Sequence, residues 1–207
     1  MFLLRWLRQL YDWTMKWGES KYAVLALCII SFAEASFFPV PPDILLIAMC
    51  LSKPKKSFLY AGYTSIMSVT GGVAGFFIGY SLMTSVGIPI LKFYGLMDWF
   101  NQLSVTFAKF NFWAVFIAAL TPIPYKVFTI TAGAVAANPE LSVPFAGYFA
   151  TFMLASISGR SIRFFGVSTL IYYFGKKVKE WIDKYFNWAA LGLACLLVGG
   201  FLLIKYV

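Results

Sequence analysis

The sequence predicts an all-α integral membrane protein. We expect an inverted repeat of a re-entrant hairpin plus a transmembrane helix, with an N-terminal interfacial amphipathic helix and a C-terminal transmembrane helix. Three observations predict this fold class: apolar residues are in large excess, uncharged blocks reach membrane-spanning length, and two further apolar segments are broken by closely spaced prolines.

The composition separates this chain from soluble domains. Of its 207 residues, 61% are hydrophobic and only 12% are charged, against about 45–50% and about 25% in soluble domains. Residues 57–82 and 188–204 contain no charged side chain, and both blocks reach the roughly 17–25 residues that a spanning helix needs. No stretch is polar enough for a separate soluble domain, so we expect one membrane domain.

The net charge of +9 does not indicate nucleic-acid binding. The basic residues cluster beside apolar segments, where they set topology and meet anionic lipid. The three cysteines lie in apolar runs and match no metal spacing, so they are interpreted as small buried hydrophobes. We therefore predict no metal and no cofactor.

The N-terminal segment, residues 1–21, is expected to be an interfacial helix. Its charged and polar residues recur at helical spacing opposite a face of leucines and tryptophans, which is typical of a helix lying in the membrane surface. The polar positions are Arg5, Arg8, Gln9, Asp12, Lys16 and Glu19.

The membrane domain, residues 22–187, begins with a re-entrant hairpin over residues 22–52. Pro39, Pro41 and Pro42 break this apolar segment, because proline cannot continue a helix. The piece after the break, residues 44–52, would extend only about 13 Å, which is under half of a hydrocarbon core of about 30 Å.

The remaining elements follow in order. A transmembrane helix is expected over residues 57–83, where five small residues permit close helix packing: Gly62, Gly71, Gly72, Gly75 and Gly79. Residues 84–110 are expected to form an interfacial or surface helix. A second re-entrant hairpin over residues 111–137 is broken at Pro122 and Pro124. A transmembrane helix over 143–175, a basic amphipathic segment and a final transmembrane helix over 188–207 complete the chain.

Two matches indicate an internal repeat. The pattern Pro-x-Pro-x-charged occurs at residues 39–43 and again at 122–126, and the tripeptide Ala-Gly-Tyr occurs at 61–63 and again at 146–148. The order is the same and the offset is nearly the same, so we expect a duplicated unit of hairpin plus helix.

The basic residues predict the orientation. With a cytoplasmic N terminus and two re-entrant hairpins, nearly all lysines and arginines outside the apolar segments fall inside, and only Lys92, Lys109 and Lys205 fall outside. The two halves then have inverted topology, as in many secondary transporters.

A small set of ionisable residues lies in otherwise apolar surroundings: Glu34, Asp43, Lys126, Arg160 and Arg163. Each costs roughly 2.5–3.5 kcal/mol at the centre of a bilayer, so a function is expected. Arg160 and Arg163 share one helix face and could hold a phosphate or carboxylate. Glu34 is the candidate proton carrier. A structural alternative stays open, in which these groups only pair with one another, as Glu34 with Arg163 or Asp43 with Lys126.

Residues 32–43, FAEASFFPVPPD, together with residues 121–126, TPIPYK, resemble the DedA family, also called the SNARE-associated Golgi or VTT-domain family. The resemblance covers roughly residues 20–175. It implies facing re-entrant hairpins in the bacterial cytoplasmic membrane, with Glu34 and Asp43 matching the acidic pair of the family. Lys126 stands near one arginine of the second motif. The other arginine has no counterpart in residues 118–121, and we hypothesise that Arg160 and Arg163 compensate.

These observations predict a transporter or lipid translocase. The resemblance implies that it moves a lipid-linked phosphate such as undecaprenyl phosphate, which would bind Lys126, Arg160 and Arg163 while Glu34 and Asp43 couple the movement to protons. The alternative is a proton-coupled transporter of a small ion or solute. An enzyme is not expected, since the chain has no histidine and offers few ligands or nucleophiles at depth. The expected partners are membrane lipids and protons, and homo-oligomerisation stays open.

Overall fold

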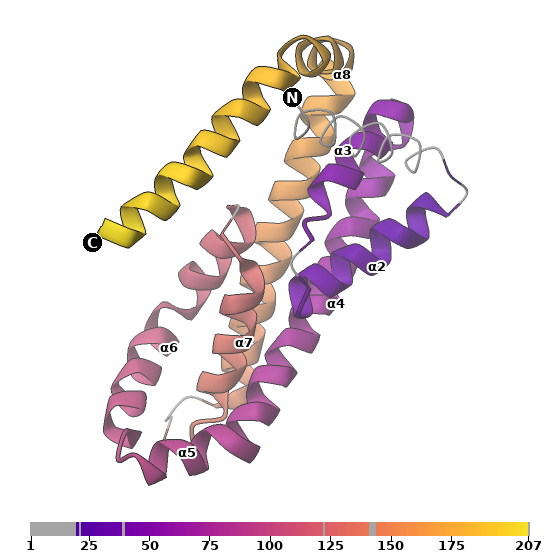
Figure 1. The fold of residues 1–207 in the computed structure, drawn as a ribbon. Coiled ribbons are helices and arrows are strands. Elements are labelled where there is room, and N and C mark those ends of the chain that lie inside the picture. Colours follow the sequence, from indigo (N-terminus) through magenta and orange to yellow (C-terminus); the bar gives the residue numbers. More distant parts are fainter. Residues whose placement is uncertain (1–19, 21, 39, 122, 141–143, 207) are drawn as a thin grey trace.

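The computed structural model describes residues 20, 22–38, 40–121, 123–140 and 144–206, with side chains for all of these except residues 176 and 178–206. Every regular element in this part of the chain is a helix (Figure 1). The interfacial helix predicted over residues 1–21 lies outside the described residues apart from residue 20.

Within the described residues, two helices are long and apolar enough to cross a membrane. The first runs over residues 54–93 and contains α4 (Ser57–Leu82), the π-helical turn η2 (Met83–Gly87) and α5 (Ile88–Phe93). The second is α6 (Met97–Leu120). The bounds of α4 confirm the helix predicted from residue 57.

The prediction of a surface helix over residues 84–110, separate from a short apolar arm, is wrong. Helix α6 runs without interruption for 24 residues, because residues 97–120 contain neither glycine nor proline. It begins just after Gly95, whose positive φ of 67° forms the turn from α5, and Asp98 lies favourably in its first turn.

Two pairs of helices are joined at the proline-containing breaks. Helices α2 (Ala23–Ser36) and α3 (Asp43–Ser52) have 14 and 10 residues, so they extend only about 21 Å and 15 Å. Helix α6 is joined in the same way to α7 (Tyr125–Ala136), which has 12 residues. In Figure 1 the α2–α3 pair opens toward the upper right of the molecule and the α6–α7 pair opens toward its lower end.

The last helix, α8 (Phe145–Tyr206), is continuous, whereas the sequence predicts three successive segments there. Helices α2 and α7 both pack against α4, while α3 and α6 pack against α8, and α4 packs against α8. The centre of the molecule therefore lies between α4 and α8.

Glycines allow the closest of these contacts. Gly71 lies against the backbone of Phe32, and Gly79 lies against the carbonyl of Ile130, so that a Cβ on either glycine would collide with backbone. Gly72 and Gly75 are similarly crowded, which confirms the packing predicted for these four residues. Gly62 has nothing within 4 Å of an added Cβ, so the prediction for that residue is wrong.

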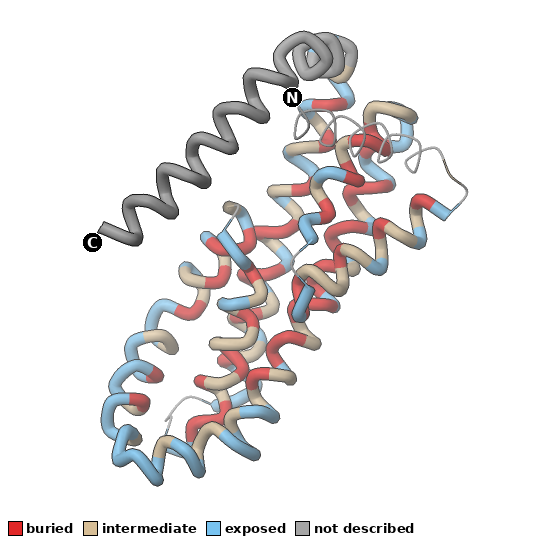
Figure 2. The backbone as a smooth tube through the Cα atoms, in the orientation of Figure 1, coloured by how far each residue is buried: buried red, intermediate tan, exposed pale blue. Residues whose placement is uncertain are grey.

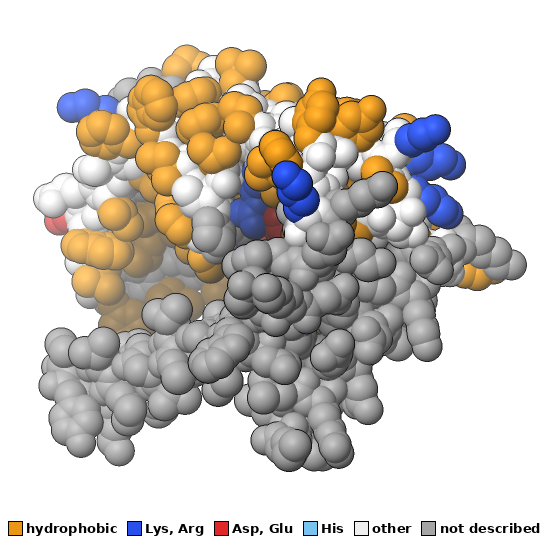
Figure 3. Space-filling view, turned by 90° about the horizontal axis from the view of Figure 1, so that it is seen from above, with side chains coloured by type: hydrophobic (Ala, Val, Ile, Leu, Met, Phe, Trp, Pro, Cys, Tyr) orange, Lys and Arg blue, Asp and Glu red, His pale blue; other side chains and the backbone are white. Residues whose placement is uncertain are grey.

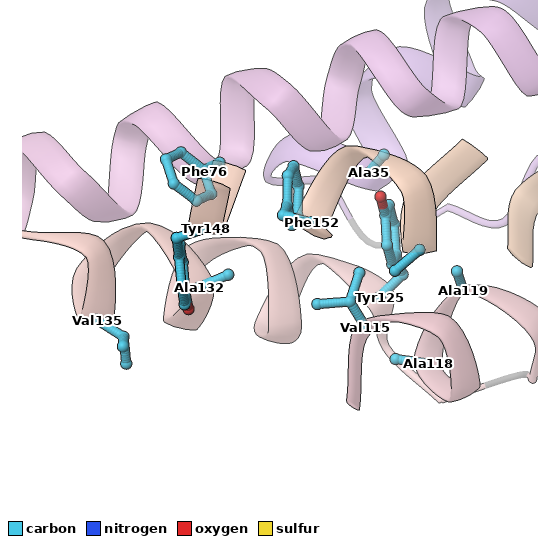
Figure 4. Packing of buried hydrophobic residues seen from close by; sticks show 11 residues of the cluster. Ala35, Phe76, Val115, Ala118, Ala119, Tyr125, Ala132, Val135, Tyr148 and Phe152 are labelled. Atoms are coloured by element: carbon cyan, nitrogen blue, oxygen red, sulfur yellow. The ribbon is translucent and has the colours of Figure 1, made fainter. Parts of the chain in front are cut away.

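The buried residues form two clusters and leave an apolar exterior. One cluster surrounds Phe76 and Phe152, which lie with Tyr125 between the packed helices in Figure 4. The other includes Leu46 and Phe164. Figure 2 shows buried positions along the inner faces of the helices and exposed ones outside. Many of the exposed side chains are large and apolar, with Ile66 at 62% and Leu154 at 64%.

Candidate functional site

Arg160 and Glu34 form a buried ion pair at the centre of the molecule. Arg160 lies midway along the first half of α8 and is only 1% exposed. Its Nη2 donates to Oε2 of Glu34 on α2 at 2.9 Å. Glu34 stands near the end of α2, one turn before the first break. The pair therefore ties α8 to the first hairpin.

Arg163 contacts both breaks. Its Nε and Nη2 donate to the two carboxylate oxygens of Asp43 at 3.1 and 2.9 Å, which is the bidentate geometry that a guanidinium favours. Its Nη1 donates to the carbonyl of Thr121. Asp43 is the first residue of α3, and Thr121 directly follows α6. One side chain of α8 thus holds the two breaks together.

Tyr125 lies beneath Arg160. The guanidinium carbon of Arg160 is 4.0 Å from the centre of the Tyr125 ring, and on another side it is 5.5 Å from the ring of Phe164. The Tyr125 hydroxyl reaches Gly72 of α4, where an added Cβ would lie only 2.6 Å from it. The two contacts of the Arg160 guanidinium with aromatic rings are cation–π interactions, and they fix the position of the buried cation.

Lys126 follows Tyr125 at the start of α7 and is half-buried. Its Nζ donates to the carbonyl of Phe38 in the first break at 3.3 Å. Next to it, the hydroxyl of Thr129 is 3.3 Å from the carbonyl of Ala35. Among the described residues, no carboxylate lies within ion-pair distance of Lys126. We call Glu34, Asp43, Tyr125, Lys126, Arg160 and Arg163 the central junction.

The structure therefore brings together every ionisable residue that the sequence singles out, but with different partners. The pairs Glu34–Arg163 and Asp43–Lys126, considered as a structural alternative, are wrong. Arg160 forms its ion pair with Glu34, and Arg163 forms its ion pair with Asp43. The two acidic groups are thereby neutralised, and the ammonium of Lys126 is the basic group of the junction that keeps no acidic partner among the described residues.

Sequence reasoning missed the role of Tyr125, because a tyrosine in an apolar segment normally packs in the core or anchors at the interface. Its position between Pro124 and Lys126 was the available signal, since it places the ring at the second break. Some polar atoms here stay without a hydrogen-bond partner among the described residues: the Tyr125 hydroxyl, the Ser156 hydroxyl and Nε of Arg160. In the same part of the chain no group of three potential metal ligands occurs.

Over the residues that the structure describes, the protein is all-helical, with two helices long and apolar enough to span a membrane and a buried, ion-paired junction between two helix breaks. The chain is 35% identical over 190 residues to an uncharacterized protein of Haemophilus influenzae, and this alignment covers 90% of this chain and 93% of that protein. It is 33% identical over 196 residues to an uncharacterized homologue from Histophilus somni, and this alignment covers 95% of this chain and 97% of that protein. The chain belongs to the same family as these two proteins. No protein-family profile matches it, and no solved structure matches it.

Proposed function

We propose that the chain is a multi-pass protein of the bacterial cytoplasmic membrane with two re-entrant hairpins in inverted topology. The apolar exterior and the short helices α2, α3 and α7 support this arrangement. Helix α6 is longer, and we propose that only its apolar second half, after Lys109, enters the membrane as an arm of the second hairpin. The helix contacts support a repeat. The first arm of each hairpin packs against the helix that follows that hairpin, α2 against α4 and α6 against α8. The second arm packs against the other long helix, α3 against α8 and α7 against α4. The arrangement matches the resemblance to the DedA family in residues 32–43 and 121–126, and the basic residues favour a cytoplasmic N terminus.

We further propose that the protein is a lipid translocase that moves a lipid-linked phosphate such as undecaprenyl phosphate. The observation on which this rests is the ammonium of Lys126, which lies where the two breaks meet and has no acidic partner among the described residues. Large apolar side chains are exposed beside it, with Phe38 at 48% and Ile123 at 44%. A cation edged by apolar surface suits a ligand with an anionic head and an apolar tail.

Protonation of Asp43 and Glu34 would control whether Arg163 and Arg160 can bind the lipid phosphate. While Asp43 is ionised, it occupies the guanidinium of Arg163. Protonation of Asp43 removes the charge that binds the guanidinium, so Arg163 becomes free to take a phosphate oxygen together with Lys126. The same exchange at Glu34 would release Arg160. Lipid phosphate and protons would then move in coupled steps.

Lipid-phosphate flipping in proteoliposomes tests this proposal. Wild-type protein should accelerate flipping, and Lys126→Gln should lower the rate about tenfold or more, because a charge-assisted hydrogen bond to phosphate contributes about 1.5–3 kcal/mol. Lys126→Arg should restore part of the rate, and Glu34→Gln should uncouple flipping from a pH gradient. Lys92→Gln, an exposed lysine outside the junction, is the matched control. Equal flipping by wild type, Lys126→Gln and empty liposomes would rule out the translocase.

A proton-coupled transporter of a small ion or solute is the second candidate. It is favoured by the Tyr125 hydroxyl, the Ser156 hydroxyl and Nε of Arg160, which are buried beside the ion pair and have no hydrogen-bond partner in the described part of the chain. Such atoms would suit a small polar ligand. Uptake of a solute driven by a pH gradient, without any lipid flipping, would select this candidate.

A further inference from the structure

A second basic feature lies at the turn between α3 and α4. Lys53, Lys55 and Lys56 are all exposed there, on or beside the short 3₁₀ helix η1 (Pro54–Lys56). This turn packs against α8, and a Cβ on Gly175 of α8 would lie 3.5 Å from Leu51. Lys177, two residues further along α8, is exposed at the same end. We call Lys53, Lys55, Lys56 and Lys177 the lysine face.

The lysine face has no acidic residue to balance it within the described side chains. The sequence contains no Asp or Glu between Asp43 and Asp98, and none between Glu140 and Glu180. Asp43 is already held by Arg163. Figure 3 shows basic side chains gathered at one edge of the upper face, with no acidic side chain of the described residues beside them. The mutual repulsion of these charges favours an anionic ligand.

Aromatic residues border the lysine face on the side of the apolar surface. Phe58 lies 5.3 Å from Tyr172 and 6.5 Å from Phe165, measured between ring centres. Tyr173 and Phe174 are 70% and 53% exposed. Tyrosines beside lysines are typical of the depth at which a protein meets lipid headgroups. The other end differs, because acidic residues occur there: Lys92 lies in the last turn of α5, Asp98 lies in the first turn of the following α6, and Glu140 accepts a hydrogen bond from Asn101 of α6.

We propose that the lysine face is a binding site for the headgroups of anionic phospholipids. Lysines on η1 and α8 would hold the phosphate, while the acyl chains lie against the aromatic residues below. Its residues are separate from the central junction, so the site is independent of the transported substrate. Each lysine near an anionic membrane surface should strengthen binding about fivefold.

Competition between lipids in native mass spectrometry tests this site, with full-length protein in detergent. Wild-type protein should retain phosphatidylglycerol over phosphatidylcholine by about tenfold or more, and 1 M salt should abolish the preference by screening. In the variant Lys53→Gln/Lys55→Gln/Lys56→Gln the preference should fall below about threefold. The matched control Lys92→Gln/Lys109→Gln should keep it.

Several outcomes would overturn the proposal: no preference in wild type, an unchanged preference in the triple variant, or an equal loss in the control. Displacement of phosphatidylglycerol by millimolar inorganic phosphate would assign the site to free phosphate instead of lipid. Thermal unfolding shows whether the triple variant is folded, and Lys55→Gln alone, with an expected loss of about fivefold, replaces it if not. Flipping activity takes no part in this readout, so the failure of one proposal leaves the other standing.

Discussion

Arg160 and Arg163 lie three residues apart on α8 and pair with different carboxylates in different surroundings. The side chains of Arg160 and Glu34 are 2% and 14% exposed, whereas those of Arg163 and Asp43 are 17% and 19% exposed. Removing one partner of a buried pair leaves the other charge without compensation, which costs about 3–5 kcal/mol. A more exposed pair loses less, because solvent screens the remaining charge.

We therefore expect Arg160→Ala to lower the free energy of unfolding by about 3–5 kcal/mol and Arg163→Ala to lower it less. Chemical unfolding in detergent measures both. The double variant Glu34→Gln/Arg160→Gln should recover part of the loss, because no unpaired charge is left behind. If Arg163→Ala were the more damaging of the two, the order of burial would not control the stability of the junction.

Tyr125 gives a second prediction for a single residue. Tyr125→Leu removes the ring beneath Arg160 and should cost about 2 kcal/mol beyond lost packing. Tyr125→Phe keeps the ring, and it removes a hydroxyl that has no hydrogen-bond partner among the described residues, so its unfolding midpoint should stay close to that of wild type. An equal loss in both variants would mean that the hydroxyl stabilises the fold.

At the scale of residues, the sequence predicted the charged members of the central junction but not their pairing. Glu34, Asp43, Lys126, Arg160 and Arg163 stand out because charges are rare in apolar segments. Their partners depend on how α2 and α3 lie against α8, and a few ångströms decide between Arg160 and Arg163. The contact of Tyr125 with Arg160 was not predicted, because the apolar sequence around Tyr125 is the same whether its ring stacks on a cation or packs in a hydrophobic core.

Among the elements, α4 has a row of glycines whose spacing controls how closely α2 and α7 approach. Gly79→Ala would push a methyl group into the carbonyl of Ile130. Because the backbone cannot move aside as a flexible side chain can, we expect a loss of about 1–3 kcal/mol from overpacking. Chemical unfolding in detergent measures the change.

Gly62→Ala on the same helix is the matched control. Nothing lies within 4 Å of the added methyl group, so the higher helix propensity of alanine should stabilise the protein by up to about 1 kcal/mol. Equal effects of the two substitutions would contradict the close packing of α4 against α7.

The elements also show where pattern reasoning stops. The breaks at residues 37–42 and 121–124 were predictable, because proline has a local effect on the backbone. The extent of α6 was not, because its polar first half, which includes Asp98 and Lys109, resembles a surface helix. Its bounds follow from the absence of a breaker between residues 97 and 120, and polarity alone is a poor guide to where a helix ends.

For the whole molecule, the proposed inverted topology makes a prediction about sidedness. Single cysteines at Ser20 and Lys55 flank the first hairpin, and those at Lys92 and Glu140 flank the second. With Cys28, Cys50 and Cys195 replaced by alanine, a membrane-impermeant thiol reagent should label the first two positions only from the cytoplasmic side and the last two only from outside. Labelling of positions 20 and 55 from opposite sides would mean that the first hairpin crosses the membrane.

Arg163 has a consequence for any motion of the two halves. Its guanidinium donates two hydrogen bonds to the carboxylate of Asp43 and one to the carbonyl of Thr121. Hydrogen bonds between two ionised groups are stronger than those to a neutral carbonyl. If the breaks separate while Asp43 is ionised, the guanidinium stays with the first hairpin and the Thr121 carbonyl is left to find a new donor. Rearrangement in that charge state would therefore start at the second hairpin, and the two ends of the molecule would not open with equal ease.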